Sequence, residues 1–162
     1  MKEETNGLNL SIRRAETADE TFLEAVYADS RRDELAPFGW SREQEDAFFK
    51  MQFQMQSRAY QMQFPDADYH IVELGGERVG RMIVQRGEKE IRLVDVSLLA
   101  EFRSRGIGTF LLERLKTEAG SDRVLSLRVL KTNAGAKRLY ERIGLVVTES
   151  SDLHFTMQWR NF

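Results

Sequence analysis

The sequence contains no cysteine, which excludes disulfide bonds, thiolate metal sites and an acyl-enzyme thioester intermediate. Histidine is nearly as scarce. The only two, His70 and His154, lie far apart in the sequence and do not have the spacing of metal ligands. We therefore expect no metal site.

Long apolar runs and a strong excess of charge of one sign are also absent. No stretch approaches the roughly 18 apolar residues of a membrane-spanning helix, and residues 1–7 are polar, unlike a signal peptide. The formal net charge is −2, from 24 basic and 26 acidic residues, so no overall positive field favours nucleic acid. We expect a cytoplasmic protein that binds neither membranes nor nucleic acid.

The size and composition are those of one soluble globular domain. The chain has 162 residues, of which 41% are hydrophobic and 31% charged, and this length suffices to bury a core. There is no internal repeat, and only two prolines, Pro37 and Pro65, interrupt the chain. We predict a single domain over residues 1–162.

The N-terminal part is predicted to form a strand and two helices. Apolar residues alternate with polar ones at residues 8–12, as in a strand. Capping-box patterns at residues 17–20 and 41–44 predict helix starts, and the first helix should end before Pro37. The second helix carries two apolar stripes at helical spacing: Phe48, Met51, Met55, Ala59 and Met62, and Phe49, Phe53, Tyr60 and Phe64. One stripe suffices to dock the helix on a sheet, so the other lines a pocket or partner surface, or the helix is deeply buried.

The remainder alternates strands and helices. Residues 124–130 are largely apolar, which is typical of a central strand covered on both faces, and Gly120 is placed to end the helix that starts at Gly106. Strands are predicted at residues 69–74, 78–85, 91–99, 124–130, 145–148 and 153–159, and helices from Gly106 and from about Ala134. The order β-α-α-β-β-β-α-β-α-β-β predicts an α/β (mixed α+β) fold, with about seven strands in a mixed sheet and helices on both faces.

The segment Arg103-Ser104-Arg105-Gly106-Ile107-Gly108 joins an apolar strand to an amphipathic helix. Such a loop directs several backbone N–H groups and the positive end of the helix at one point, which suits a phosphate or pyrophosphate. Leu111 stands where a dinucleotide-binding loop has its third glycine, and no Gly-Lys-Ser/Thr of a Walker loop is present.

Two blocks of the sequence resemble the GNAT N-acetyltransferase superfamily. Residues 96–108 are similar to the acetyl-CoA signature, in which a strand and a short turn precede Arg/Gln-x-x-Gly-x-Gly/Ala, and residues 133–145 are similar to the second family block, Asn-x-x-Ala-x-x-x-Tyr-x-x-x-Gly-Phe. The likeness extends over about residues 69–159 and is weak over residues 8–66. Ala100 replaces the common turn proline, and Leu145 replaces the usual phenylalanine.

This resemblance implies a GNAT fold, with four helices and a mostly antiparallel sheet splayed at the cofactor site, and acetyl-CoA as co-substrate. It implies that the chain moves an acetyl group to a primary amine by direct attack in a ternary complex. A non-catalytic acyl-CoA-binding or regulatory module on the same fold is the alternative. The implied cofactor-binding residues are Leu98, Leu99, Arg103, Ser104, Arg105, Gly106, Ile107, Gly108, Thr109 and Asn133. As a plain helix N-cap, Asn133 is equally well explained.

Tyr140 and Asp95 are the candidate catalytic residues. In the family, the tyrosine at the position of Tyr140 protonates the departing thiolate, which a phenol with a pKa near ~10 can do without being ionised at neutral pH; the alternative is a core aromatic. Asp95 lies within an apolar strand, on the face shared by Ile91, Leu93 and Ser97. Burying a carboxylate costs several kcal/mol unless it is paired, so Asp95 is either the base that activates the amine, as the resemblance implies, or one half of a structural ion pair with an arginine.

The acceptor is expected between the two N-terminal helices and the sheet, with Phe38, Trp40 and Tyr60 as candidate substrate-binding residues. Their apolar character favours an acceptor with a hydrophobic part, or a protein interface. The C-terminal hairpin and the additional apolar stripe are compatible with a homodimer.

Overall fold

The computed structural model describes residues 2–5 and 8–161. In chain order its elements are β1 (Lys2–Thr5), β2 (Leu8–Arg14), α1 (Glu20–Leu35), α2 (Arg42–Gln63), β3 (Asp68–Leu74), β4 (Glu77–Arg86), β5 (Glu90–Leu98), α3 (Ile107–Ala119), β6 (Val124–Leu130), α4 (Ala134–Ile143), β7 (Val146–Ser150) and β8 (His154–Trp159). The predicted element order is confirmed. The structure adds β1, a short strand that no pattern in the sequence had indicated.

One open sheet contains all the described strands, in the order β1-β2-β3-β4-β5-β6-β8-β7. Neighbouring strands are antiparallel except β5 and β6, which are parallel. The crossover between β5 and β6 contains α3, as a parallel connection requires. The predicted mixed, mostly antiparallel sheet with four helices is therefore confirmed.

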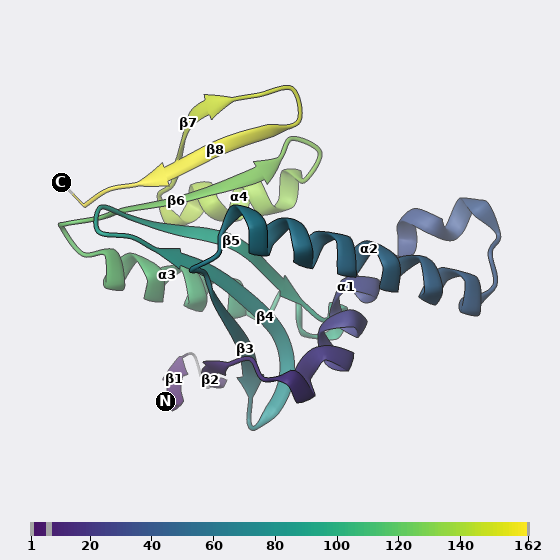
Figure 1. The fold of residues 1–162 in the computed structure, drawn as a ribbon. Coiled ribbons are helices and arrows are strands. Elements are labelled where there is room, and N and C mark those ends of the chain that lie inside the picture. Colours follow the sequence, from purple (N-terminus) through teal and green to yellow (C-terminus); the bar gives the residue numbers. More distant parts are fainter. Residues whose placement is uncertain (1, 6–7, 162) are drawn as a thin grey trace.

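The helices cover the two faces of the sheet in pairs (Figure 1). On one face, α3 and α4 pack on the strands and bury the larger core, which includes Met82, Leu111, Leu127 and Ile143. On the other face lie α1 and α2, which share a smaller aromatic core of Tyr27, Ala28, Leu35, Phe49 and Phe53. Arg81 of β4 reaches this second layer, because its Nη2 donates to Gln56 Oε1 of α2 at 2.7 Å.

The helix starts only partly follow the predicted caps. At α2 the capping box is confirmed, since Gln44 N–H donates to Ser41 Oγ at 3.1 Å and Ser41 N–H donates to Gln44 Oε1 at 2.9 Å. Before α1 the predicted box at residues 17–20 is wrong by one position. The box is formed by Glu16 and Asp19, and the N–H of Glu16 donates to Asp19 Oδ2 at 2.8 Å. Arg13 Nη1, also 2.8 Å from this oxygen, helps to hold the Asp19 side chain in place.

Helix α2 is not deeply buried. Met51, Met55 and Met62 of its first stripe are 50%, 60% and 84% exposed. The second stripe divides: Phe49 and Phe53 are buried against α1, whereas Tyr60 and Phe64 line a cavity. Thus the N-terminal two-thirds of α2 pack against α1, and its last turn lies at the cavity.

Candidate active site

The parallel pairing of β5 and β6 ends while both strands continue. It runs from Glu90 opposite Val124 to Leu93 opposite Leu127 and stops there, although β5 extends to Leu98 and β6 to Leu130. At the same point β5 contains a β-bulge. Ile83 of β4 pairs with Asp95 and the next residue, Val84, pairs with Leu93, so Val94 has no partner in β4 and is the extra residue of the bulge. A bulge bends and twists its strand, so β5 turns away from β6 and the sheet opens between them.

The opening exposes backbone groups of β5. Leu99 N–H donates to Val79 O of β4 at 2.9 Å, and Leu98 faces Gly80. Because successive residues of a strand direct their N–H and C=O groups to opposite edges, those of Val96 and Leu98 point away from β4, toward the opening. One of them is already used, since Arg103 Nε donates to Leu98 O at 3.2 Å.

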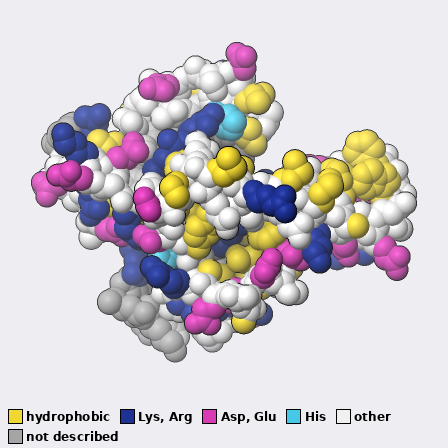
Figure 2. Space-filling model, in the orientation of Figure 1, with side chains coloured by type: hydrophobic (Ala, Val, Ile, Leu, Met, Phe, Trp, Pro, Cys, Tyr) yellow, Lys and Arg dark blue, Asp and Glu magenta, His cyan; other side chains and the backbone are white. Residues whose placement is uncertain are grey.

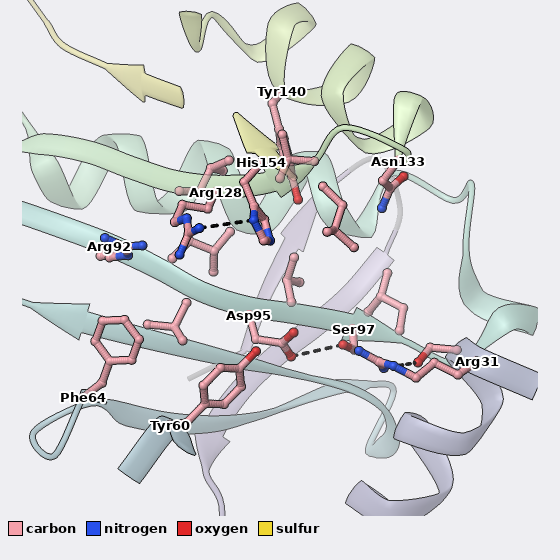
Figure 3. A pocket seen from close by; sticks show the side chains of 18 of the residues that line it. Arg31, Tyr60, Phe64, Arg92, Asp95, Ser97, Arg128, Asn133, Tyr140 and His154 are labelled. Carbon is pink, nitrogen blue, oxygen red and sulfur yellow. Dashed lines mark hydrogen bonds between the residues drawn. The ribbon is translucent and has the colours of Figure 1, made fainter. Parts of the chain in front are cut away.

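A cavity of about 720 Å³ lies at this opening, with walls from α1, α2, β5, β6, α4 and β8 (Figure 3). Six of the residues predicted from the sequence line it: Tyr60, Asp95, Leu98, Arg103, Asn133 and Tyr140. Leu99 instead lines a separate hollow of about 460 Å³ beside α1 and α2. The cavity therefore brings residues of the second sequence block together with the strand residues that begin the first block.

Tyr140 extends from α4 toward the space between β5 and β6 (Figure 3). Its side chain belongs to the core, as one of the two sequence interpretations held, yet it also lines the cavity. Burial, and secondarily the negative charge of Asp95, raise the pKa of Tyr140 to about 12. The phenol therefore remains protonated at neutral pH and is able to donate its proton or a hydrogen bond.

Asp95 faces α2, and the predicted placement beside Ile91 and Leu93 is wrong. Those two residues are buried in the larger core, and the extra residue of the bulge rotates Asp95 to the opposite face. There its Oδ2 accepts from Arg81 Nε at 2.8 Å and from Ser97 Oγ at 3.1 Å. The ion pair with an arginine, the second interpretation of Asp95, is thus present, and both of these hydrogen bonds use the same carboxylate oxygen.

The loop before α3 has the form of an anion-binding site. Gly106 is the N-cap residue with φ of +83° and offers no side-chain cap, and Ser104 has a φ of +61°, the only positive value at a non-glycine among the residues described. The first helical bond joins Phe110 N–H to Gly106 O. The N–H groups of residues 107–109 consequently have no acceptor within the helix, and a diphosphate group fits this cradle of amides.

The side chains around this loop add positive charge without closing it. Arg103 lines the cavity, and the Arg105 guanidinium lies 5.2 Å from the centre of the Phe102 ring. The rest of the loop and the start of α3 follow Arg103 but do not line the cavity; these residues are Ser104, Arg105, Gly106, Ile107, Gly108 and Thr109. The loop and the cavity therefore adjoin at Arg103.

Two side chains fix the loops that follow β5 and β6. Asn133 Oδ1 accepts from Ala136 N–H at 3.1 Å, so Asn133 is the N-cap of α4, and it also lines the cavity. Ala100 N–H donates to Asp29 Oδ2 of α1 at 2.6 Å. A proline at position 100 has no N–H, so the departure from the family pattern allows a bond between the turn and α1.

Phe38 and Trp40 do not line the cavity. They precede α2, whereas Tyr60 is near its end, and at 1.5 Å per residue the intervening helix is about 27 Å long. The two rings lie 5.7 Å apart and are 63% and 39% exposed. Hydrophobic side chains gather at the tip of the α1–α2 hairpin, on the right in Figure 2. Of the three predicted acceptor residues, only Tyr60 lies at the cavity.

Several cavity residues were not found by sequence reasoning, chiefly Arg31, Arg92, Arg128 and His154. Arg92 and Arg128 interrupt apolar strands, and that interruption was the available signal. The expectation that residues 124–130 are covered on both faces holds around Ser126, which is buried like Leu125 and Leu127, and is wrong further along, where Arg128 and Leu130 are exposed.

In the part of the chain that the structure describes, no group of His, Asp or Glu is arranged to hold a metal ion. Over the same residues, no helix combines the length and the apolarity needed to cross a bilayer.

Comparisons with known proteins identify the family of the chain and the fold that it shares with solved structures. The family model of the acetyltransferase (GNAT) family matches residues 20–145, and the chain belongs to this family. A search of curated proteins finds no match to the sequence.

Solved structures with the same fold include several acetyltransferases. The PaiA N-acetyltransferase of Thermoplasma acidophilum, in complex with coenzyme A, has a TM-score of 0.69 and 18% identity over 94% of this chain and 99% of that one. A GNAT acetyltransferase of Listeria monocytogenes has a TM-score of 0.67 and 16% identity over 98% and 99% of the two chains. The ribosomal-protein-S18-alanine N-acetyltransferase of Escherichia coli has a TM-score of 0.59 and 22% identity over 92% of each.

Proposed function

We propose that residues 1–162 form one acetyltransferase domain that moves the acetyl group of acetyl-CoA to a primary amine by direct attack in a ternary complex. The observation that carries this function is the opening between β5 and β6, where the Tyr140 phenol and unpaired backbone groups of β5 share one cavity. Acetyl-CoA supplies an acetyl group activated as a thioester. The absence of cysteine favours direct attack over transfer through an enzyme thiol.

The residues around the opening suit the parts of acetyl-CoA. The amides of residues 107–109 and the guanidinium of Arg103 would bind the diphosphate. The backbone groups of Val96 and Leu98, with Asn133 opposite them, would bind the pantetheine arm. A donor N–H at Leu98 would also stabilise negative charge that develops on the carbonyl oxygen during transfer.

Asp95 would receive the amine on the α2 side of the opening. Its Oδ2 is occupied by Arg81 and Ser97, while no bond to Oδ1 is formed by the residues described. Oδ1 would accept a hydrogen bond from the amine, directly or through water, and draw off the proton that the amine must lose. The ion pair with Arg81 fixes the carboxylate in this orientation.

Tyr140 would donate its proton to the departing sulfur. Since its pKa is about 12, the phenol is fully protonated over the pH range in which the amine reacts. Its burial also keeps bulk water from competing for the same position.

The first test is thermal unfolding with and without acetyl-CoA, with NADH and ATP as controls. A ligand at 100 times its dissociation constant adds about 2.7 kcal/mol, which for a chain of this size raises the midpoint by roughly 5 to 10 °C. A rise with acetyl-CoA alone is expected. No rise at near-millimolar acetyl-CoA would contradict the cofactor assignment and with it the enzymatic function.

The second test is Tyr140→Phe, followed by release of CoA thiol in the presence of amines. The phenylalanine keeps the ring that packs in the core, so we expect unchanged acetyl-CoA affinity and a loss of roughly 10²- to 10⁴-fold in kcat, the usual contribution of a general acid. Equal turnover in the two proteins would remove Tyr140 from the mechanism. Acetyl-CoA binding without turnover for any amine would indicate a non-catalytic acyl-CoA-binding module.

A further inference from the structure

Three arginines that line the cavity have no carboxylate partner. Arg31, Arg92 and Arg128 form no ion pair with any residue that the structure describes. Elsewhere pairing is common: Arg13, Arg32, Arg78, Arg81 and Arg86 each lie 3.2 Å or less from a carboxylate oxygen. The cavity therefore keeps guanidinium groups available for a ligand.

Arg92 and Arg128 lie side by side at the closed end of the opening. Arg92 is paired with Ser126, and Arg128 is two residues further along β6. With a strand spacing of about 4.8 Å and a rise of about 3.3 Å per residue, their Cα atoms are roughly 8 Å apart. Both side chains line the cavity, Arg128 next to His154 and closer to Tyr140, and Arg92 near Phe64 at the end away from Asn133 (Figure 3). This separation allows two guanidinium groups to converge on one carboxylate.

Each of these guanidinium groups is oriented by a neutral neighbour. The Arg92 guanidinium lies 5.4 Å from the centre of the Phe64 ring, and Arg128 Nη2 is 3.1 Å from His154 Nδ1. Partial burial and the charge of Arg128 hold the pKa of His154 below its usual value, which favours the neutral ring that accepts this bond. Both arginines are thus positioned while their charge is left uncompensated.

The charges lining the cavity are predominantly positive, although the chain has a net charge of −2. Arg31, Arg92, Arg103 and Arg128 line it together with the carboxylates of Glu34 and Asp95, and Asp95 is already paired with Arg81. A concave surface of one sign concentrates ligands of the opposite sign. Arg103 adjoins the diphosphate loop, which leaves Arg31, Arg92 and Arg128 for the other substrate, and of these Arg92 and Arg128 lie on the adjoining strands β5 and β6.

We infer that the amine acceptor also carries a carboxylate, which Arg92 and Arg128 bind while the amine faces Asp95 and Tyr140. This inference rests on the proposed function and names its substrate class: amino acids or short peptides with a free carboxylate. Polycationic amines are excluded, because the same two arginines would repel them.

The test compares matched acceptors under saturating acetyl-CoA. Each amino acid is assayed beside its carboxamide, with dipeptides that carry a free C-terminus and spermidine as further acceptors. We expect the carboxylate form to be preferred by about 10- to 100-fold in kcat/KM, the value of a hydrogen bond to a charged group. Dipeptides used better than free amino acids would identify a peptide acceptor, and the reverse would identify a free amino acid. Equal use of carboxylates and carboxamides, or a preference for spermidine, would overturn the inference.

The variants Arg92→Gln and Arg128→Gln test the residues themselves. Each should raise KM for the carboxylate acceptor about tenfold or more and bring the preference over the carboxamide toward unity, with unchanged acetyl-CoA affinity. Arg142→Gln, an exposed change on α4 away from the cavity, is the matched control and should have no effect. If both Arg92→Gln and Arg128→Gln kept the full preference for the carboxylate over the carboxamide, the assignment of these two arginines to the carboxylate would be refuted.

A binding measurement keeps the inference testable where turnover is absent. N-acetylamino acids and their carboxamides are titrated into the protein with CoA present, by calorimetry. If the wild-type protein binds the carboxylates and Arg128→Gln lowers that affinity about tenfold, the anion site is supported independently of catalysis. No binding of either form by the wild-type protein overturns it, whereas failure of CoA itself to bind would contradict the proposed function.

Discussion

Replacing Gly106 with alanine tests whether the backbone conformation of the loop before α3 matters for stability and for acetyl-CoA. Gly106 has a φ of +83°, and a Cβ built there meets no atom within 4 Å. The added methyl group therefore causes no clash, and its effect comes from the backbone angle alone. Left-handed angles cost an L-residue roughly 1–2 kcal/mol.

The expected change in thermal midpoint follows from this strain. For a chain of this size, 1 kcal/mol corresponds to about 2–4 °C, so Gly106→Ala should lower the midpoint by about 2–8 °C. Gly135, in the first turn of α4, is the matched control. A Cβ there also meets nothing within 4 Å, but its φ is not positive. Gly135→Ala should therefore stabilise the protein by up to about 1 kcal/mol through helix propensity.

The assay is calorimetric or fluorescence-detected unfolding of the two variants, each with and without acetyl-CoA. If Gly106→Ala relaxes the loop toward negative φ, the amides of residues 107–109 no longer converge, and acetyl-CoA affinity should fall by about tenfold, the loss of one charge-assisted hydrogen bond. Gly106→Asn should lose less, because asparagine tolerates left-handed angles. Unchanged stability and affinity in Gly106→Ala would show that the φ of this residue is not required and that the loop does not bind the diphosphate.

Two further predictions concern the buried ion pairs. Arg81→Met leaves the Asp95 carboxylate without its partner where both side chains are largely buried, at 8% and 18% exposure, and should lower the free energy of unfolding by about 3–5 kcal/mol. In urea unfolding, the double variant Arg81→Met/Asp95→Asn should lose clearly less stability than the sum of the losses in the two single variants. Strict additivity of these losses would mean that the two residues are not coupled. Asp19 is buried and accepts from Arg13, and these bonds hold the pKa of its carboxyl well below its usual range. A lowered folded-state pKa contributes stability that is present above about pH 4 and is lost as the pH falls further, so Asp19→Asn should be less stable than the wild type at pH 7, and the difference should narrow toward pH 2; an equal difference at both pH values would contradict this.

The sequence predicted those parts of the molecule that depend on short-range patterns. The capping box at Ser41 and the C-cap at Gly120 were both predicted, because each depends on a few adjacent residues whose conformational preferences are strong. The two family blocks likewise identified the loop before α3 and the tyrosine of α4.

What the sequence did not predict depends on contacts between distant strands. Arg92 and Arg128 are 36 positions apart and adjoin only because β5 and β6 are parallel in one register. The face of Asp95 was misassigned because strict alternation assumes an unbroken ladder, and a bulge adds a residue without a reliable mark in the sequence. Phe38 and Trp40 were placed at the cavity because their aromatic character was visible, whereas the length of α2 that separates them from it acts only in three dimensions.

The bulge at Val94 connects several properties of the candidate site. It rotates Asp95 out of the core and toward Arg81 and α2, and it bends β5 away from β6 where their pairing stops. Because the bend separates the strands, the backbone groups of Val96 and Leu98 lose the neighbour that a continuous sheet would provide. Both residues are half-buried and line the cavity, so their backbone groups are available to hydrogen-bond a ligand that enters between the strands. The same irregularity that defeats prediction by alternation thus prepares the opening to bind an amide-rich arm on one side and to present a carboxylate to an amine on the other.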